Sequence, residues 1–131
     1  MSTRRRIRLT VAAAAFGLAG LGTTLAHHSQ SQFETVKVVS IEGTFTAISW
    51  SNPHTLFFLN ARPADAANAT LQHWEVEGPG PRGLENAGWT KGMSKVGDKV
   101  VITGRPRRDG KPELLLTKLV LADGTVFNFK P

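Results

Sequence analysis

Apolar and polar residues alternate between Val39 and Ala47, where every second residue is apolar or glycine. This period of two is typical of a half-buried β-strand. The phase then slips, so that Ile48 and Trp50 are the next apolar positions. A phase change in a strand that contains Gly43 predicts a bulge or a sharp bend.

The remaining apolar runs predict further strands and one short helix. Turn signals rich in Gly, Pro, Asn and Asp separate these runs. Pro81 at the start and Gly88 just past the end are typical helix boundaries. The expected strands cover residues 54–61, 71–77, 99–105 and 113–121, with a short tail strand at 126–129 and the helix at 81–87.

Three strands, a short helix and two further strands form the order of a five-stranded OB barrel. The sequence therefore predicts a mainly β fold, an OB-like barrel with its helix between strands three and four. The same pattern is also compatible with another small antiparallel barrel or a sandwich. Trp89, which follows the helix, is expected to fill the core beneath it.

The first 26 residues have the three parts of a secretory signal peptide. Arg4-Arg5-Arg6 and Arg8 form a basic start, an Ala-, Leu- and Gly-rich run follows, and Thr24-Leu25-Ala26 is a small-x-small cleavage site. Glycines and threonines dilute the run, so it is a poor match for the about 20 apolar residues of a membrane-spanning helix. The general secretory route and the twin-arginine route both fit this segment.

Cleavage after Ala26 would leave a signal peptide at 1–26, a polar arm at 27–35 and a barrel domain at 36–131. We expect the mature protein to be periplasmic or secreted, with no transmembrane segment after signal removal. The mature length suits one domain. Because the chain has no cysteine, we expect no disulfide framework.

Most of the positive charge lies in the predicted signal peptide. The whole chain has 16 Lys and Arg against 10 Asp and Glu, a formal charge of +6. Four of these arginines and none of the acids lie in the first 26 residues, which leaves 12 bases, 10 acids and a charge of +2. A nucleic-acid partner, which a strongly basic protein would suggest, is therefore not expected.

Two adjacent histidines, His27 and His28, directly follow the predicted cleavage site. Cleavage would make His27 the new amino terminus, with a free amine and an imidazole on one residue. Both groups can lose a proton to a metal ion near neutral pH, because their ordinary pKa values are about 8 and 6.5. The histidine pair is therefore a candidate metal-binding group.

A further histidine, His54, begins the second predicted strand. If strands two and three form a hairpin about the loop at 62–70, His54 faces Glu77. The arm enters strand one, which pairs with strand two in this fold, so the arm histidines could reach the His54 rim. The expected metal site consists of His27, His28, His54 and Glu77.

A ligand set rich in nitrogen suits Cu(II) first, with Ni(II) and Zn(II) as competitors. The sequence carries no metal-ligand spacing motif. A competing interpretation therefore stays open: the histidine pair belongs to a polar arm, and His54 is a strand residue hydrogen-bonded to Glu77.

A second candidate site is the basic loop between the fourth and fifth strands, which often borders the ligand groove of OB folds. Its basic residues are Arg105, Arg107, Arg108 and Lys111. They predict binding of an anionic ligand or an envelope protein. Single-stranded nucleic acid would also need exposed aromatic residues, such as Trp50, Phe57 or Trp74. A plain solvated hairpin explains the same charges.

Motifs of enzymes are missing from the sequence. It contains no hydrolase nucleophile motif, no Gly-rich phosphate loop after a strand and no HExxH. Glu75 and Glu77 alternate on a strand, which usually marks a solvent face, and His73 is expected on the same surface. We therefore expect a binding protein rather than an enzyme.

Six short motifs lie between Ala26, at the predicted cut, and Gly124: Ala26-His27-His28-Ser29, Trp50-Ser51-Asn52-Pro53-His54, Trp74-Glu75-Val76-Glu77-Gly78, Gly88-Trp89-Thr90, Gly97-Asp98-Lys99-Val100 and Leu121-Ala122-Asp123-Gly124. Together they resemble a family of small exported bacterial proteins, known as a domain of unknown function. The resemblance implies export and a small β-barrel, with recurring positions at His28, His54, Glu77 and Trp89. It implies no activity. One departure is that the apolar residue expected soon after Ser29 is delayed to Phe33.

Overall fold

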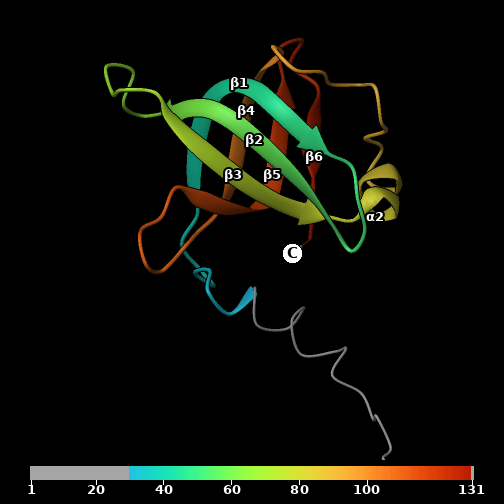
Figure 1. Ribbon diagram of the computed structural model, residues 1–131, viewed down its shortest axis with the longest axis horizontal. Helices are drawn as coiled ribbons and strands as arrows, with labels where there is room; N and C mark the ends of the chain where they lie inside the picture. Colours follow the sequence, from blue (N-terminus) through green and yellow to red (C-terminus); the bar gives the residue numbers. More distant parts are fainter. Residues whose placement is uncertain (1–29, 131) are drawn as a thin grey trace, which may run out of the picture.

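The computed structural model describes residues 30–130, and within them the fold is a β-barrel with one short helix, α2 (Figure 1). In chain order the elements are β1 (Val39–Ser49), β2 (His54–Pro63), β3 (Gln72–Pro79), α2 (Pro81–Asn86), β4 (Lys99–Pro106), β5 (Glu113–Leu121) and β6 (Val126–Asn128). All predicted strands and the helix are therefore present. Within the described residues, no helix has the length and apolarity needed to cross a membrane.

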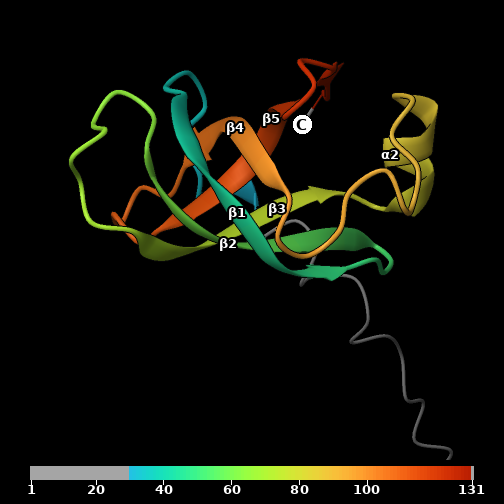
Figure 2. The ribbon, with the colours of Figure 1, turned by 90° about the horizontal axis from the view of Figure 1, so that it is seen from above.

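Five of the strands close into the barrel. β1 lies between β2 and β4, which are both antiparallel to it, and these strands continue to β3 and β5. The ring closes because β3 pairs in parallel with the first part of β5, with Glu75 opposite Glu113. β6 adds to the second part of β5, and Figure 2 shows α2 to one side of the strands. The OB-like prediction is confirmed, and the antiparallel barrel and the sandwich are wrong.

The strand β1 contains the predicted bulge, but the bulge lies beyond Gly43. The register between β1 and β2 shifts between Phe45 and Ala47, and both Phe45 and Ile48 pack in the core. Gly43 has a different role, because a Cβ atom there would overlap the carbonyl oxygen of Asn60 on β2. Glycine thus allows the two strand backbones to approach closely.

Trp89 lies at the centre of the core, as predicted. Its side chain is fully buried, and the ring centroids of Phe57, Trp50 and Phe45 lie 5.1, 5.8 and 6.5 Å from its own. Gly88, directly after α2, has a φ of 91°, a conformation that favours glycine at the end of a helix. The turn at Gly88 therefore directs Trp89 into the barrel.

Candidate functional site

Strands β2 and β3 form the predicted hairpin in a register that differs by two residues. His54 lies opposite Pro79, and Glu77 lies opposite Leu56. The predicted direct pairing of His54 with Glu77 is wrong, because the hairpin is centred one residue later in the chain. Side chains of a strand alternate with a period of two, so a shift of two residues keeps each side chain on its face. His54 and Glu77 are therefore diagonal neighbours on the outer face.

These two side chains touch. Nδ1 of His54 lies 3.3 Å from Oε1 of Glu77 and 3.4 Å from the carbonyl oxygen of Gly78. Both neighbours are acceptors, an arrangement that in a neutral ring favours the tautomer with its hydrogen on Nδ1 and the lone pair on Nε2. The His54 side chain is 28% exposed and that of Glu77 15%. The pair is thus shielded by the barrel rim but accessible to a ligand.

His54 borders a shallow pocket of about 240 Å³ at the rim of the barrel, whereas Glu77 does not line it. Its lining includes His54, Pro53, Gly80 and Gln30. A Cβ atom at Gly80 would lie 2.7 Å from the carbonyl oxygen of Pro53, so glycine lets the start of α2 approach the β1–β2 turn. Gln30 is the first described residue, and the amino-terminal segment therefore reaches the rim that His54 occupies.

Residues 30–34, here called the strap, reach this rim by an unexpected route. Phe33 is only 4% exposed. The backbone N–H of Arg108 donates to the carbonyl oxygen of Gln32 at 2.9 Å, and Nε of Arg108 donates to that of Phe33 at 3.0 Å. The expected route by way of strand one is wrong, because the strap follows the loop between β4 and β5. The burial of Phe33 in a polar arm is a feature that sequence reasoning missed.

The histidines His27 and His28 lie outside the described residues. Within residues 30–130, no group of three or more His, Asp or Glu side chains could hold a metal ion. The described residues therefore contribute His54 and Glu77 to the predicted set, and the complete metal site stays a prediction.

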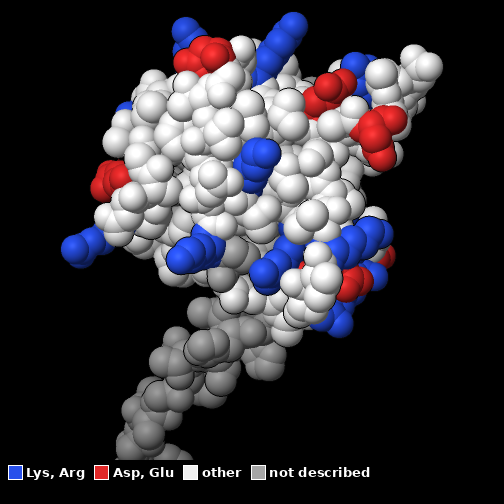
Figure 3. All heavy atoms as spheres, turned by 180° about the vertical axis from the view of Figure 1, so that it is seen from behind, with Lys and Arg blue, Asp and Glu red and all other residues white. Residues whose placement is uncertain are grey.

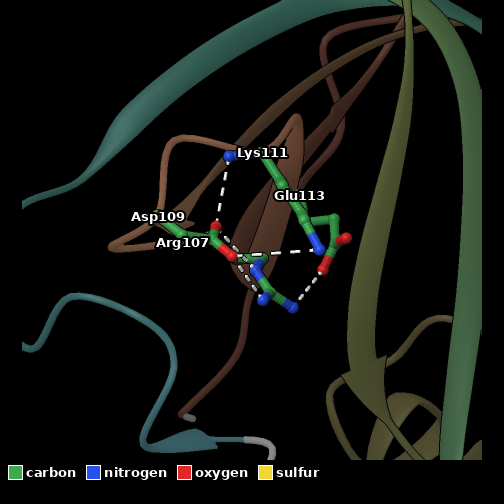
Figure 4. Close-up of polar contacts among 4 residues, drawn as sticks. All are labelled: Arg107, Asp109, Lys111 and Glu113. Carbon is green, nitrogen blue, oxygen red and sulfur yellow. Dashed lines mark hydrogen bonds and ion pairs between the residues drawn. The ribbon is translucent and has the colours of Figure 1, made fainter.

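Arg107 holds the loop between β4 and β5 together (Figure 4). Its guanidinium donates to both carboxylate oxygens of Asp109 at 2.9 and 2.6 Å and to Glu113 at 2.9 Å. The bond to Asp109 raises the pKa of Arg107, and the same bond lowers the pKa of Asp109 to about 2. The charge of Arg107, predicted to bind an anion, is thus already balanced within the protein.

The other predicted anion ligands lie around the same loop. Arg108 is exposed and anchors the strap. Nζ of Lys111 lies 4.0 Å from Oδ2 of Asp109, and Arg105 pairs with Leu115 in the ladder between β4 and β5. Figure 3 shows basic and acidic side chains mixed at this end of the barrel. Binding of an anionic ligand or an envelope protein here stays a prediction.

A groove of about 790 Å³ lies beside this loop, at the barrel end where β1 begins. Arg107, Arg108 and Lys111 line it together with Lys37 and Trp74. Lys37 belongs to no motif in the sequence, and only its place beside the loop reveals it.

The aromatic side chains offer little surface for stacking on bases. Phe57 is fully buried, so its predicted role as an exposed platform is wrong. Trp50 and Trp74 are partly buried and pack against the core.

The outer face of β3 carries a row of polar residues. The exposed His73 stacks on Phe58, with ring centroids 6.0 Å apart, which confirms its predicted surface position. Partial burial raises the pKa of Glu75, and the carboxylates of Glu113 and Glu77 raise it further. The charge of Glu75 is therefore unfavourable in the folded protein.

Comparison with known protein families assigns the chain to one of them. A sequence model described as a family of unknown function, DUF6152, matches residues 17–115. The chain belongs to this family. No curated protein and no solved structure matches it.

The DUF6152 match confirms the predicted membership in a domain family of unknown function. It begins within the predicted signal peptide and ends in β5, so β6 lies beyond it. Both candidate sites, the histidine rim and the basic loop, fall within the part of the chain that the DUF6152 model matches. Their function must be argued from chemistry, because the family description assigns none.

Proposed function

We propose that this DUF6152 protein is an exported, non-enzymatic binding protein that holds a transition metal ion, Cu(II) foremost, at the His54 rim. The observation that carries the proposal is the 3.3 Å contact between Nδ1 of His54 and Oε1 of Glu77. A metal-binding histidine usually donates its second ring N–H to a carboxylate or carbonyl oxygen, which fixes the ring and makes the ligating nitrogen more basic. His54 has this arrangement, with Nε2 left for a metal.

In this proposal Glu77 orients His54, and its direct ligation of the metal is secondary. The amine and imidazole of His27 supply further nitrogen donors, and His28 adds another. Such a set favours Cu(II) over Zn(II), because Cu(II) binds nitrogen ligands most tightly among the common divalent ions. Carboxylate-rich sets would favour harder ions instead.

The position of the strap supports the reach of these histidines. Gln30 borders the same pocket as His54, and the burial of Phe33 fixes the strap three residues further along. The short segment between His27 and Gln30 therefore starts from an anchored point beside His54.

Calorimetric titration with Cu(II) of a protein that begins at His27 tests the proposal. We expect one ion per molecule. His54→Ala should lower the affinity strongly, and Glu77→Gln should lower it by about 10- to 100-fold, as is usual for partners of a metal-bound histidine. The matched control is His73→Ala, which removes a surface histidine that stacks on Phe58 and should leave the affinity unchanged.

A second pair of proteins tests the amino terminus. One extra alanine before His27 displaces the amine and should weaken Cu(II) binding, and the mass of the exported protein establishes whether the cut follows Ala26. Equal affinity of the extended protein would remove the amine from the ligand set. Equal affinity of the His54→Ala and His73→Ala variants would overturn the site at the rim.

A further inference from the structure

A second pocket lies between the aromatic core and the loop that joins α2 to β4. It has a volume of about 290 Å³, and Ile48, Trp50 and Trp89 line one side. The other lining residues come from the loop and are Thr90, Lys91, Gly92, Ser94, Lys95 and Val96. Ligand pockets usually measure about 300–1,000 Å³, so this one lies at the lower limit and has room for a small molecule only. The Trp50 ring, which meets Trp89 edge-on at 5.8 Å and is partly exposed, offers an aromatic surface.

Two lysines give this pocket a positive charge. Lys91 and Lys95 line it, and no acidic residue of the described chain does. The nearby Asp98 accepts the backbone N–H of Lys95 through Oδ2 at 2.9 Å. Within residues 30–130, neither lysine forms an ion pair. An anionic group at the pocket would therefore meet two cations that have no carboxylate partner.

Two hydrogen-bonding groups at this pocket lack a partner within the described chain. They are the indole N–H of Trp89 and the hydroxyl of Ser94, both of which are buried. A buried donor that makes no hydrogen bond has lost its bond to water without replacement. An acceptor atom brought within hydrogen-bonding distance of the Ser94 hydroxyl would satisfy it.

Exposed apolar side chains extend the pocket surface along the same loop. Met93 is 43% and Val96 62% exposed, and Val96 also lines the pocket. Apolar walls beside basic and donor groups are the usual composition of a small-molecule site, in which a few polar groups fix the orientation of an apolar ligand.

We propose that this pocket binds a small aromatic carboxylate. The ring packs between Ile48 and Trp50, and the carboxylate accepts hydrogen bonds from Ser94 and from Lys91 and Lys95. The site shares no residue with the proposed metal site, so either proposal can fail without the other.

The test uses 2-naphthoate as the probe and its uncharged analogue 2-naphthamide as the matched ligand. Binding is followed by calorimetry and by the indole N–H resonances of the three tryptophans. We expect saturable binding of 2-naphthoate that shifts the resonances of Trp50 and Trp89 and leaves that of Trp74 in place. The amide should bind about tenfold more weakly, because it lacks the charge.

Paired substitutions test the lysines. The Lys91→Gln/Lys95→Gln variant should bind 2-naphthoate about tenfold more weakly, whereas the control Lys99→Gln/Lys118→Gln, which removes two exposed lysines that do not line the pocket, should bind normally. Ser94→Ala should also weaken binding, by a smaller factor. The proposal is overturned by an absence of saturable binding, by equal losses in the two lysine variants, or by equal affinity for 2-naphthamide or for the aliphatic octanoate.

Discussion

Arg108 donates a hydrogen bond from Nε to the carbonyl oxygen of Phe33 at 3.0 Å, although the two residues lie 75 positions apart in the sequence. Beside it, the backbone N–H of Glu34 donates to the carbonyl oxygen of Pro106 at 2.9 Å. These bonds fix the strap on the loop that follows β4. A loop that the sequence marks as a ligand site therefore also anchors the amino-terminal segment.

Removal of the Phe33 ring should loosen this anchor. Because the side chain is 4% exposed, we expect Phe33→Ala to lower the free energy of unfolding by about 3 kcal/mol. Guanidinium denaturation followed by circular dichroism measures the change. The control is Val36→Ala, at a side chain that is 90% exposed, where the effect should stay within about 0.5 kcal/mol. Similar effects of the two substitutions would mean that the strap adds nothing to stability.

Trp89 should be the most sensitive single position in the core. Its replacement by alanine removes the ring around which Phe45, Phe57 and Trp50 pack, and a cost of about 4 kcal/mol is expected. The free energy of unfolding of small domains is about 5–15 kcal/mol. The Trp89→Ala protein should therefore retain little stability. Trp89→Phe keeps part of the packing and gives a measurable unfolding curve. A loss in Trp89→Ala no larger than in Trp50→Ala would contradict the central role.

The ion pair of Arg107 and Asp109 should make stability depend on pH in acid. The hydrogen bond from Arg107 lowers the pKa of Asp109 from 3.8 to about 2. The stabilisation is therefore fully present above about pH 3.8 and is lost as the pH falls through about 2. Asp109→Asn should be less stable than the unmodified protein at pH 5, and the difference should vanish once the pH falls below about 2.

Urea unfolding across this pH range measures the effect. In an Arg107→Gln background the carboxylate has lost its main hydrogen-bond donor, so the Asp109→Asn substitution should have a smaller effect. An unchanged pH dependence in that background would show that the pair is not its source.

Glu75 should give stability a pH dependence of the opposite sign to that of Asp109. Burial, Glu113 and Glu77 raise its pKa above the ordinary 4.5, so the folded state disfavours the ionised form. Stability is then lost as the pH rises from the ordinary value through the raised one. Glu75→Gln should therefore be more stable than the unmodified protein at pH 7, with the advantage disappearing below about pH 4.5.

Thermal unfolding at pH 7 and pH 4 measures this difference. The matched change is Glu85→Gln at the exposed surface of α2, which should stay within about 0.5 kcal/mol at either pH. A lower melting temperature for Glu75→Gln than for the unmodified protein at pH 7 would contradict the prediction.

The barrel was predictable because local patterns determine its elements. The alternation of apolar and polar residues identifies β1. Pro81 and Gly88 mark the two ends of the helix that brings Trp89 into the core. The register between β2 and β3 was harder to predict from the sequence. The loop that connects them is long, so it does not determine which residues of the two strands lie opposite each other. The error of two residues preserved the faces of the strands, and the contact between His54 and Glu77 therefore survived it.

The strap was beyond the reach of sequence patterns. Phe33 is a single aromatic residue in a polar segment, and its partners Arg107 and Arg108 lie in a distant loop. Neither periodicity nor spacing reports a contact between such separated residues. The sequence likewise does not show which basic residues are already paired with carboxylates. The structure shows that Asp109 and Glu113 balance the charge of Arg107.

The strap and the parallel ladder between β3 and β5 also set an order of events. A chain that emerges with its amino terminus first must complete the loop after β4 before Phe33 finds its place, and it must complete β5 before the ring closes. Contacts between distant segments form slowly. The strap is therefore held in place only after β4 and the loop that follows it have formed.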